Sequence, residues 1–322
     1  MNTQSLQYFL TIVEKMSISH AADNLFISQQ ALSANMKRLE EELGVKLFIR
    51  KPVLRLTQAG KMMTFYARQM LRTEAQMASG FADLSANCTG HLAIGMSRQR
   101  SNVFFPGIWK RYHKFYENIA ISLHGLITSE MIEGVESGKL DMFVGMNVPS
   151  TNNLCITPIV LERIVCLINE KVLKKYMPNS WQSFLEKSKN LGIDLFDIKD
   201  LPFITFLPDN AIRIAVNQIF AGKNILPKVV METAEHEIIF NLGCEGCGVA
   251  ILSPIVLYDY EHGIKKIPKN CHVFQINNDI SVNKLSLVYR QDVVFPNYAE
   301  GMKKAIIQEL THYNFSIESI LH

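Results

Sequence analysis

A polar face on one predicted helix carries the residue types with the clearest chemistry in this sequence. The helix should begin after Ser28, a residue type favoured as an N-cap, and end at Gly44, where a glycine can adopt positive φ. Its apolar inner face consists of Leu32, Met36, Leu39 and Leu43. The first turn and the outer face carry Ser28, Gln29, Gln30, Ser33, Lys37 and Arg38.

These side chains are suited to duplex DNA. A Gln amide can pair with adenine through two hydrogen bonds, and Arg or Lys can bind guanine or a phosphate. Ser28 and Gln29 would lie at the positive end of the helix dipole, which favours a backbone phosphate. A solvated polar face is the alternative for this helix taken alone, and the base read by each residue is left open.

The charge of the chain is concentrated around this helix. Residues 1–86 contain ten Lys/Arg and seven Asp/Glu, whereas residues 87–322 contain 23 of each. Within residues 28–72, nine basic residues face three acidic ones, which is the charge distribution of a phosphate-binding surface. Two short strands around a turn with Pro52 should follow the helix, and this wing places Arg50, Lys51 and Arg55 near flanking phosphates or the minor groove.

Other chemistries have weaker signals. Cys244 and Cys247 form a CxxC motif, but a structural zinc site needs two more ligands, and the sequence has no second pair of comparable spacing. Buried reduced thiols and a redox switch both remain open for these two cysteines. HExxH, GxSxG, P-loop and dinucleotide-binding motifs do not occur. We therefore expect no enzymatic activity, no cofactor and no metal site.

Three further helices should position this face. The first has an apolar stripe of Leu6, Phe9, Leu10 and Val13, and the second should begin at Ser19 as its N-cap. A long helix should run from Thr57 to about Leu84. Along it Met63, Met70, Met77 and Leu84 recur every seven residues, so this stripe either forms a coiled-coil-like dimer seam or packs on the protein's own core.

The rest of the chain has another organisation. Short apolar strands alternate with helical segments from residue 91 onward, which predicts parallel α/β sheets. Residues 87–91 read as the linker, and 297–311 as a closing amphipathic helix.

The N-terminal sixty residues resemble the LysR-type transcriptional regulators. The matching residues are Leu6, Phe9, Ser17, Ser19, Ala21, Ala22, Leu25, Ser28, Gln29, Ser33, Leu39, Glu40, Leu43, Gly44, Leu47, Phe48, Arg50, Leu56, Thr57, Ala59 and Gly60. A looser match at Gly95, Pro106, residues 138–141, Gly246, Gly248 and Pro254 extends to the C-terminus. Two departures stand out, because the wing is about one residue short and residues 171–200 look like an insertion.

The resemblance implies an N-terminal winged helix-turn-helix, a long linker helix and a two-lobed α/β effector domain similar to periplasmic binding proteins. The expected boundaries are 1–60 for DNA binding, 57–86 for the linker and dimerisation helix, 87–90 for a hinge and 91–322 for effector binding. Lobe one should comprise 91–165 and 266–322, and lobe two 166–265.

Effector-binding residues are then expected in a cleft between the lobes. Ser97 and Thr128 match positions where family members place a hydroxyl on the ligand, although helix capping is the alternative for both. Arg98 and Arg100 would favour an anionic effector if either turns inward, and would carry no information if both face water. The further candidates are Ser101, Asn102, Ser129, Thr205, Phe206 and Gly246.

The expected function is thus sequence-specific regulation of transcription under the control of a small, anionic effector. The partners implied are double-stranded DNA, the effector and further copies in a homodimer or homotetramer, while contact with RNA polymerase is left open. No signal peptide or membrane span is recognised, so we expect a cytoplasmic protein. The alternatives are a thiol-based redox regulator of the same architecture and a small-molecule-binding protein without a role at DNA.

Overall fold

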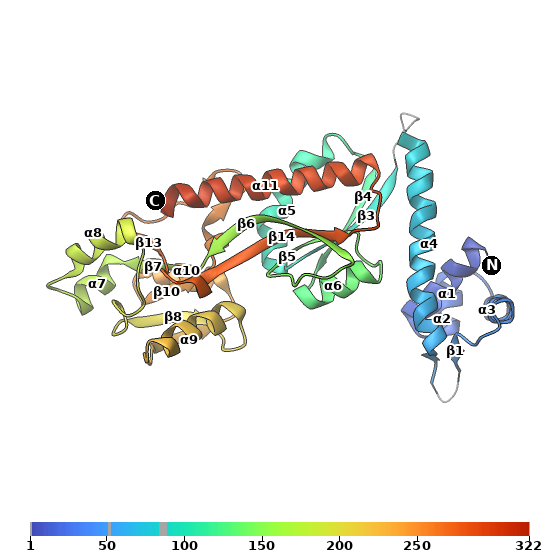
Figure 1. The fold of residues 1–322 in the computed structure, drawn as a ribbon, viewed down its shortest axis with the longest axis horizontal. Helices are drawn as coiled ribbons and strands as arrows, with labels where there is room; N and C mark the ends of the chain where they lie inside the picture. Colours follow the sequence, from blue (N-terminus) through green and yellow to red (C-terminus); the bar gives the residue numbers. More distant parts are fainter. Residues whose placement is uncertain (1, 51–52, 84–88, 322) are drawn as a thin grey trace.

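The computed structural model describes residues 2–50, 53–83 and 89–321 and begins with a winged helix-turn-helix (Figure 1). Its elements are α1 (Thr3–Lys15), α2 (Ile18–Asn24), α3 (Gln29–Leu43), β1 (Phe48–Ile49) and β2 (Arg55–Leu56), followed by the linker helix α4 (Gln58–Asp83). Strands β1 and β2 pair antiparallel and form the wing. Apolar side chains of α1, α2, α3, the wing and the first turns of α4 make one core. The winged-helix fold predicted from the sequence is confirmed.

Two local expectations for this domain are wrong. The N-cap of α2 is Ser17, whose hydroxyl accepts a hydrogen bond from the His20 N–H at 3.3 Å, and Ser19 therefore lies inside the helix. Leu43 is exposed, because it is the last residue of α3 and the chain turns away at Gly44. Glu40 is buried there instead.

Lobe one is built on a five-stranded sheet with the order β4-β3-β5-β14-β6. Its strands are β3 (Gly90–Met96), β4 (Ile119–Gly125), β5 (Met142–Met146), β6 (Leu154–Arg163) and β14 (Val282–Arg290). Strands β3, β4 and β5 are parallel, and β14 runs antiparallel to β5 and β6. Helices α5 (Arg98–His113) and α6 (Thr128–Glu136) follow β3 and β4, as expected for strand–helix alternation.

Lobe two is built on a second sheet with the order β13-β7-β10-β8-β9. Its strands are β7 (Val165–Asn169), β8 (Pro202–Phe206), β9 (Lys228–Thr233), β10 (Val249–Leu252) and β13 (Cys271–Gln275). Helices α9 (Ala211–Gly222) and α10 (His236–Glu245) lie between these strands in the chain. A short 3₁₀ helix (Pro254–Leu257) and the hairpin of β11 (Tyr258–Asp259) and β12 (Gly263–Ile264) follow β10.

Two chain segments cross between the lobes. The first passes from β6 to β7 at Ile164, and the second from β13 to β14 through a 3₁₀ turn (Asp279–Ser281). Ile164 bonds to this second segment on both sides, donating to the Ser281 carbonyl at 2.9 Å and accepting from the Ile276 N–H at 3.2 Å. Because β13 pairs with β7, the expected return of the chain to lobe one at residue 266 is too early, and the return follows Gln275.

The long C-terminal helix α11 (Asn297–Leu321) extends beyond the expected segment 297–311 and packs against elements of both lobes (Figure 1). The inserted segment folds as α7 (Glu170–Tyr176) and α8 (Trp181–Leu191). Phe184 of α8 packs on Phe274 of β13, and Ile193 forms a parallel bridge with Ile276. The insertion therefore covers an edge of the second sheet. Among the residues described, no helix has the length and hydrophobicity needed to span a membrane.

Candidate DNA interface and effector site

The predicted DNA-contacting residues of α3 lie outside its buried face. Leu32, Met36 and Leu39 are at most 2% exposed and hold the helix on α1 and α2. Ser28 caps α3 by accepting from the Ala31 N–H at 3.1 Å. Exposed side chains are Ser28, Gln29, Gln30, Lys37 and Arg38, and Ser33 is half-buried. Lys37 lies 3.7 Å from Glu41 in a solvated pair that leaves its ammonium accessible.

Gln29 is connected to the preceding helix. The Ser19 hydroxyl of α2 donates to the Gln29 side-chain oxygen at 3.0 Å, and both residues are exposed. Sequence reasoning placed Ser19 at a helix cap and missed this contact, because a hydrogen bond across ten residues depends on how α2 and α3 pack.

Glu40 fixes the wing to α3. Its carboxylate accepts from the backbone N–H of Leu47 at 2.8 Å and of Phe48 at 3.3 Å, and from the Lys46 ammonium at 3.1 Å. Arg50 of the wing lies 3.9 Å from the same carboxylate. Burial raises the pKa of Glu40, but these hydrogen bonds and the Lys46 charge outweigh it and hold the pKa below its ordinary value. Arg50 and Arg55 are exposed, and Lys51 lies outside the described residues.

The linker helix α4 follows strand β2 of the wing directly. Thr57 donates from its hydroxyl to the Lys46 carbonyl at 2.6 Å, and its hydroxyl oxygen accepts from the Gly60 N–H at 2.9 Å, which caps α4. A Cβ at Gly60 would lie 2.1 Å from the Leu47 carbonyl oxygen, so only glycine allows this close approach. Helix α3, the wing and the linker helix therefore meet at Leu47.

The methionine stripe on α4 divides between two roles. Met63 is 9% exposed and belongs to the winged-helix core, so the prediction of a continuous seam from Met63 is wrong. Met70 and Met77 are 45% and 57% exposed. Met62 and Tyr66 are exposed as well and extend this apolar stripe, whereas Leu84 lies outside the described residues.

In lobe one, the candidate hydroxyls stand at two helix N-termini. Ser97 is the N-cap position of α5 but its side chain makes no capping hydrogen bond. Thr128 is the first residue of α6. The N-cap of this helix is Ile127, whose backbone N–H donates to the Glu130 carboxylate at 3.2 Å. The helix-capping interpretation therefore fails for both hydroxyls. Ser129 and Asn102 are exposed, and the Ser101 hydroxyl contacts the Met96 carbonyl at 3.5 Å.

Of the two arginines, Arg98 is exposed and Arg100 turns inward. Arg100 donates to Glu162 at 2.9 Å, and its Nε atom is buried without a hydrogen-bond partner among the described residues. Glu162 also accepts from Ser253 of lobe two at 3.3 Å and from Tyr313 of α11 at 3.0 Å. This buried network joins both lobes to α11. Glu162 was not predicted, although it is an acidic residue within an apolar stretch at 159–168.

Lobe two contributes His236, the first residue of α10, which sequence reasoning also missed. Its ring lies 4.4 Å from the Phe206 ring. Burial, and secondly the charge of Arg100, lower the pKa of His236 to about 4, so the imidazole is neutral at pH 7. Thr205 is 98% buried on the opposite face of the same strand, and its hydroxyl has no partner among the described residues. The structure thus brings Arg100 and Phe206 to a common histidine.

Gly246 lies elsewhere, and its expected place between the lobes is wrong. It ends α10 with a φ of +82°, one full helix length from His236, and packs against Lys171 and Asn169. Leu252, at the C-terminal end of β10, pairs with Val165, where the chain has just crossed between the lobes. Gly246 precedes the opposite, N-terminal end of β10 and is therefore on the far side of the sheet from the crossing.

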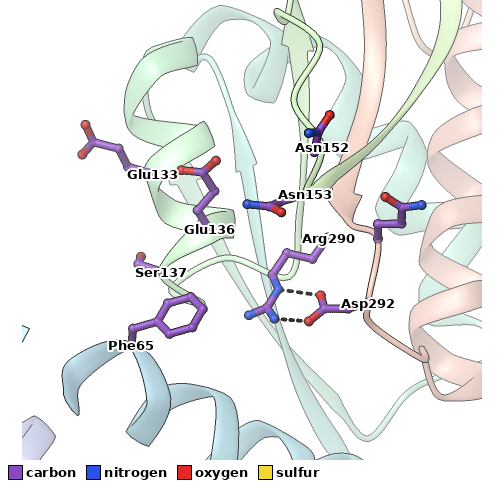
Figure 2. Close-up of a pocket in the computed structure, with 9 residues that line it drawn as sticks. Phe65, Glu133, Glu136, Ser137, Asn152, Asn153, Arg290 and Asp292 are labelled. Atoms are coloured by element: carbon purple, nitrogen blue, oxygen red, sulfur yellow. Dashed lines mark hydrogen bonds and ion pairs between the residues drawn. The ribbon is translucent and has the colours of Figure 1, made fainter. Parts of the chain in front are cut away.

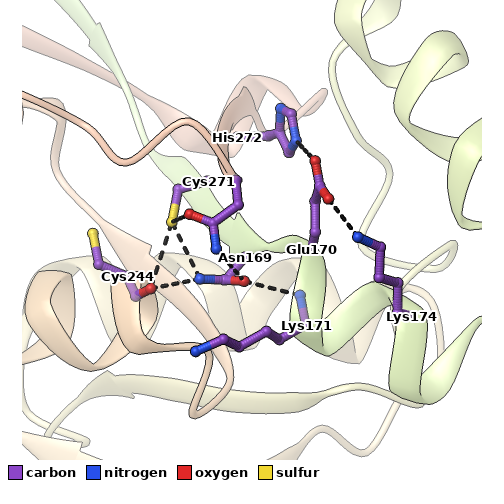
Figure 3. Close-up of polar contacts among 8 residues, drawn as sticks. Asn169, Glu170, Lys171, Lys174, Cys244, Cys271 and His272 are labelled. Atoms are coloured by element: carbon purple, nitrogen blue, oxygen red, sulfur yellow. Dashed lines mark hydrogen bonds and ion pairs between the residues drawn. The ribbon is translucent and has the colours of Figure 1, made fainter.

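Cys244 lies next to Cys271 of β13, whose sulfur is 3.6 Å from the Cys244 carbonyl oxygen (Figure 3). Asn169 lies between them, donating to the Cys244 carbonyl at 2.5 Å and to the Cys271 sulfur at 3.5 Å. Burial, with the neighbouring Cys271, raises the pKa of Cys244 to about 12, and burial also raises the pKa of Cys271. Thiols held in the protonated form react slowly with oxidants, so these environments disfavour redox sensing.

Lobe one meets the linker helix around a cavity of about 750 Å³ (Figure 2). Arg290, at the end of β14, forms a two-pronged ion pair with Asp292, and its guanidinium lies 5.5 Å from the centre of the Phe65 ring of α4. Glu133, Glu136 and Ser137 of the C-terminal part of α6 line the same cavity.

Comparison with known proteins identifies both halves of the chain. Residues 3–61 match the family model of bacterial regulatory helix-turn-helix proteins of the lysR family, and residues 86–300 match the LysR substrate binding domain. The chain belongs to the LysR family of transcriptional regulators. As in other LysR-type regulators, a DNA-binding helix-turn-helix is joined to an effector-binding domain in one chain.

Relatives of this LysR-type regulator share its full architecture. A probable RuBisCO transcriptional regulator from Trieres chinensis is 28% identical over 257 residues, which cover 78% of this chain and 80% of the relative. A full-length OxyR variant from Pseudomonas aeruginosa has a TM-score of 0.65 at 20% identity, covering 95% of this chain and 94% of that one. CbnR bound to its target DNA has a TM-score of 0.57 at 18% identity, covering 96% and 100%. These structures share the fold.

Proposed function

We propose that the regulator reads its operator with α3 in the major groove and with the wing on the flanking backbone. One observation carries this proposal: Leu32, Met36 and Leu39 of α3 are buried, so the exposed side of the helix with Gln30, Lys37 and Arg38 is the surface that meets DNA beside the basic wing. Ser28 and Gln29 stand at the N-terminus of the helix, where backbone N–H groups and the helix dipole favour a phosphate.

Binding of the full-length protein to operator fragments selected from genomic DNA tests the assignment. Gln30→Ala and Arg38→Ala should each weaken operator binding by about 1–3 kcal/mol and relax base preference, because each removes a base-edge contact. Lys187→Ala, which removes an exposed basic side chain from α8, is the control and should bind as the wild type does. Wild-type affinity and selectivity of both α3 variants would show that another surface reads the DNA.

We further propose that a small anion binds between the lobes, at the N-termini of α5 and α6. Support comes from the hydroxyls of Ser97 and Thr128, which stand at these termini without capping them. Helix N-termini carry positive potential, and Arg98 adds an exposed positive charge. Arg100 contributes less net charge because Glu162 neutralises it, but its free Nε–H is a donor at the same end of α5.

A thermal-shift screen of the full-length protein with small carboxylates and phosphates, each paired with a neutral isostere, tests the ligand class. A ligand of the folded state raises the unfolding temperature with the logarithm of its concentration over Kd. Stabilisation by anions alone is expected. Stabilisation by the neutral isosteres alone would contradict an anionic effector.

We propose that two copies associate through the exposed stripe of α4, so that two copies of α3 read two half-sites. A soluble monomer seldom leaves an apolar stripe such as Met62, Tyr66, Met70 and Met77 uncovered along one helix. Two-fold proteins of the helix-turn-helix class bind half-sites spaced by whole turns of DNA.

A further inference from the structure

Ser19 is an exposed residue of the winged helix-turn-helix whose hydroxyl does not cap a helix. Ser17 caps α2, so the Ser19 hydroxyl is free of that function, and it donates instead to the Gln29 side-chain oxygen at 3.0 Å. The bond joins the second residue of α2 to the first residue of α3. Both side chains are exposed. A hydrogen bond in water adds little to folding stability, so its consequence must lie in the orientation of Gln29.

The chemistry of the amide defines that orientation. A Gln side chain has an acceptor oxygen and a two-donor nitrogen on opposite sides of one planar group. When the oxygen accepts from Ser19, the nitrogen points away from α2 and presents N–H donors. A phosphate oxygen can only accept hydrogen bonds, so this orientation suits the DNA backbone and the flipped one does not.

The adjacent backbone provides donors for the same group. Ser28 takes up the Ala31 N–H, while the N–H groups of Gln29 and Gln30 lie in the first turn, where the helix offers no acceptor. The amide nitrogen of Gln29 and these backbone groups all stand at the N-terminus of a 15-residue helix. An oriented Gln29 therefore completes a donor set for one phosphate.

We propose that Ser19 is a positioning residue for DNA binding, which holds the Gln29 amide so that its N–H donors face a backbone phosphate. The proposal rests on the placement of α3 at DNA given under the proposed function. Ser19 itself touches no phosphate in this arrangement and acts through Gln29.

A double-mutant cycle on full-length protein and a selected operator fragment tests this role. Gln29→Ala should weaken binding about tenfold, the effect of losing one hydrogen bond to a charged group. Ser19→Ala should weaken it about threefold, because Gln29 must then be ordered on binding. In the Gln29→Ala background, Ser19→Ala should have no further effect. Ser19→Thr keeps a hydroxyl and should restore wild-type affinity.

Two further measurements separate positioning from folding. Ser19→Ala should leave the thermal unfolding temperature unchanged, whereas Ser17→Ala removes the true cap of α2 and should lower it. The salt dependence of binding should be the same for wild type, Ser19→Ala and Gln29→Ala, because neither change removes a charge that displaces counterions.

Each outcome decides the proposal. Equal losses from Ser19→Ala with Gln29 present and absent would overturn it, because Ser19 would then act independently of Gln29. Failure of Ser19→Thr to restore binding would overturn it as well. Unchanged binding by Gln29→Ala would show that Gln29 does not contact a phosphate, and the proposed role of Ser19 would fail with it. If Gln30→Ala and Arg38→Ala also left binding unchanged, α3 would not meet DNA at all.

Discussion

At the residue scale, a buried carboxylate connects the two lobes of the effector domain. Glu162 is 3% exposed and has hydrogen bonds from lobe one, lobe two and α11 through Arg100, Ser253 and Tyr313. A buried carboxylate is tolerated because these donors replace its hydration, and removing one partner would leave charge uncompensated. The network therefore fixes how the lobes meet rather than adding much free energy.

His236 gives this region a dependence on pH. Its pKa is about 4 in the folded protein and near 6.5 in an unfolded chain, so between these values the unfolded state binds the extra proton. Above pH 6.5 the imidazole is neutral in both states and does not change the free energy of unfolding with pH. Acidification from pH 6.5 toward pH 4 should lower this free energy by up to about 3 kcal/mol. Urea unfolding of the full chain at pH 7.5 and pH 4.5 measures the loss.

His236→Gln should lose less stability on this acidification than the wild type does. His262→Gln removes an exposed histidine and controls for the loss of an imidazole. Identical acid sensitivity of wild type and His236→Gln would contradict the burial of a neutral imidazole beside Arg100.

Sequence reasoning succeeded where local periodicity determines the outcome. The polar and buried faces of α3 follow from helical spacing, and both Ser28 and Thr57 begin helices as predicted. It failed where packing between distant segments decides. The positions of Gly246, Glu162 and His236 depend on which strands become neighbours, and the sequence within any one strand does not contain that information.

At the element scale, the wing is held from two sides. Glu40 of α3 binds the N–H groups of Leu47 and Phe48, and Thr57 at the start of α4 binds the Lys46 carbonyl. Hydrogen bonds therefore connect both α3 and the start of α4 to the segment that enters the wing. The wing was predicted as two strands, but its attachment was not, because a buried Glu in an amphipathic helix looks like a surface residue.

Glu40→Gln should loosen the wing. Both backbone N–H groups donate to the same oxygen, Oε1, so a Gln amide oxygen can still accept from them, but without the negative charge. The amide NH2 would replace Oε2 and face the Lys46 ammonium, so the charge-assisted bond from Lys46 is lost. These changes should lower the opening free energy of Leu47 and Phe48 by about 1–3 kcal/mol. Since the folded-state pKa of Glu40 is lowered, its stabilisation is complete above the ordinary Glu pKa and is lost as pH falls through the folded value. The wild type and variant should therefore converge in acid.

Amide hydrogen exchange of the full-length protein, followed by mass spectrometry, reports on the segment 46–50. Glu41→Gln changes the exposed neighbour and should leave protection unchanged. Equal protection of this segment in wild type and Glu40→Gln at pH 7 would show that the Glu40 carboxylate does not hold the wing on α3.

The linker helix leads to a prediction about assembly. Met70→Glu combined with Met77→Glu should weaken the proposed dimer by several kcal/mol, because unpaired charges would be buried at its interface. Met63→Ala should instead destabilise the winged helix by about 2–5 kcal/mol and leave the dimer intact, since Met63 belongs to that core. Sedimentation equilibrium distinguishes the two effects. An unchanged dimer in the double variant would place the subunit contact elsewhere.

At the scale of the whole molecule, the short helix α6 extends from the proposed effector site to the cavity beside the linker helix. The N-terminus of α6 carries Thr128, and its C-terminal part faces the cavity beside Phe65 of α4. Arg290 on Phe65 adds a second contact between lobe one and the linker helix. A ligand that prefers one arrangement of the lobes shifts the population toward it, and we propose that these contacts connect such a shift to α4.

Ser97→Ala and Thr128→Ala should each weaken binding of the effector found by thermal shift about five- to tenfold, as expected for one hydrogen bond each. Operator affinity without effector should stay at the wild-type value, because neither residue belongs to the winged helix. Calorimetry of the full chain measures the first effect, with Ser183→Ala in α8 as the exposed serine control. Full effector affinity in both variants would move the ligand away from these helix termini.

If two copies of α3 read duplex DNA, hydroxyl-radical footprinting of the intact protein on selected genomic fragments should show both contacts. We expect two protected patches on one face of the duplex, spaced by whole helical turns of about 10 base pairs. Both patches should weaken together with Arg38→Ala at matched salt. Binding without sequence preference, or a footprint that Arg38→Ala leaves unchanged, would show that α3 does not read the DNA sequence.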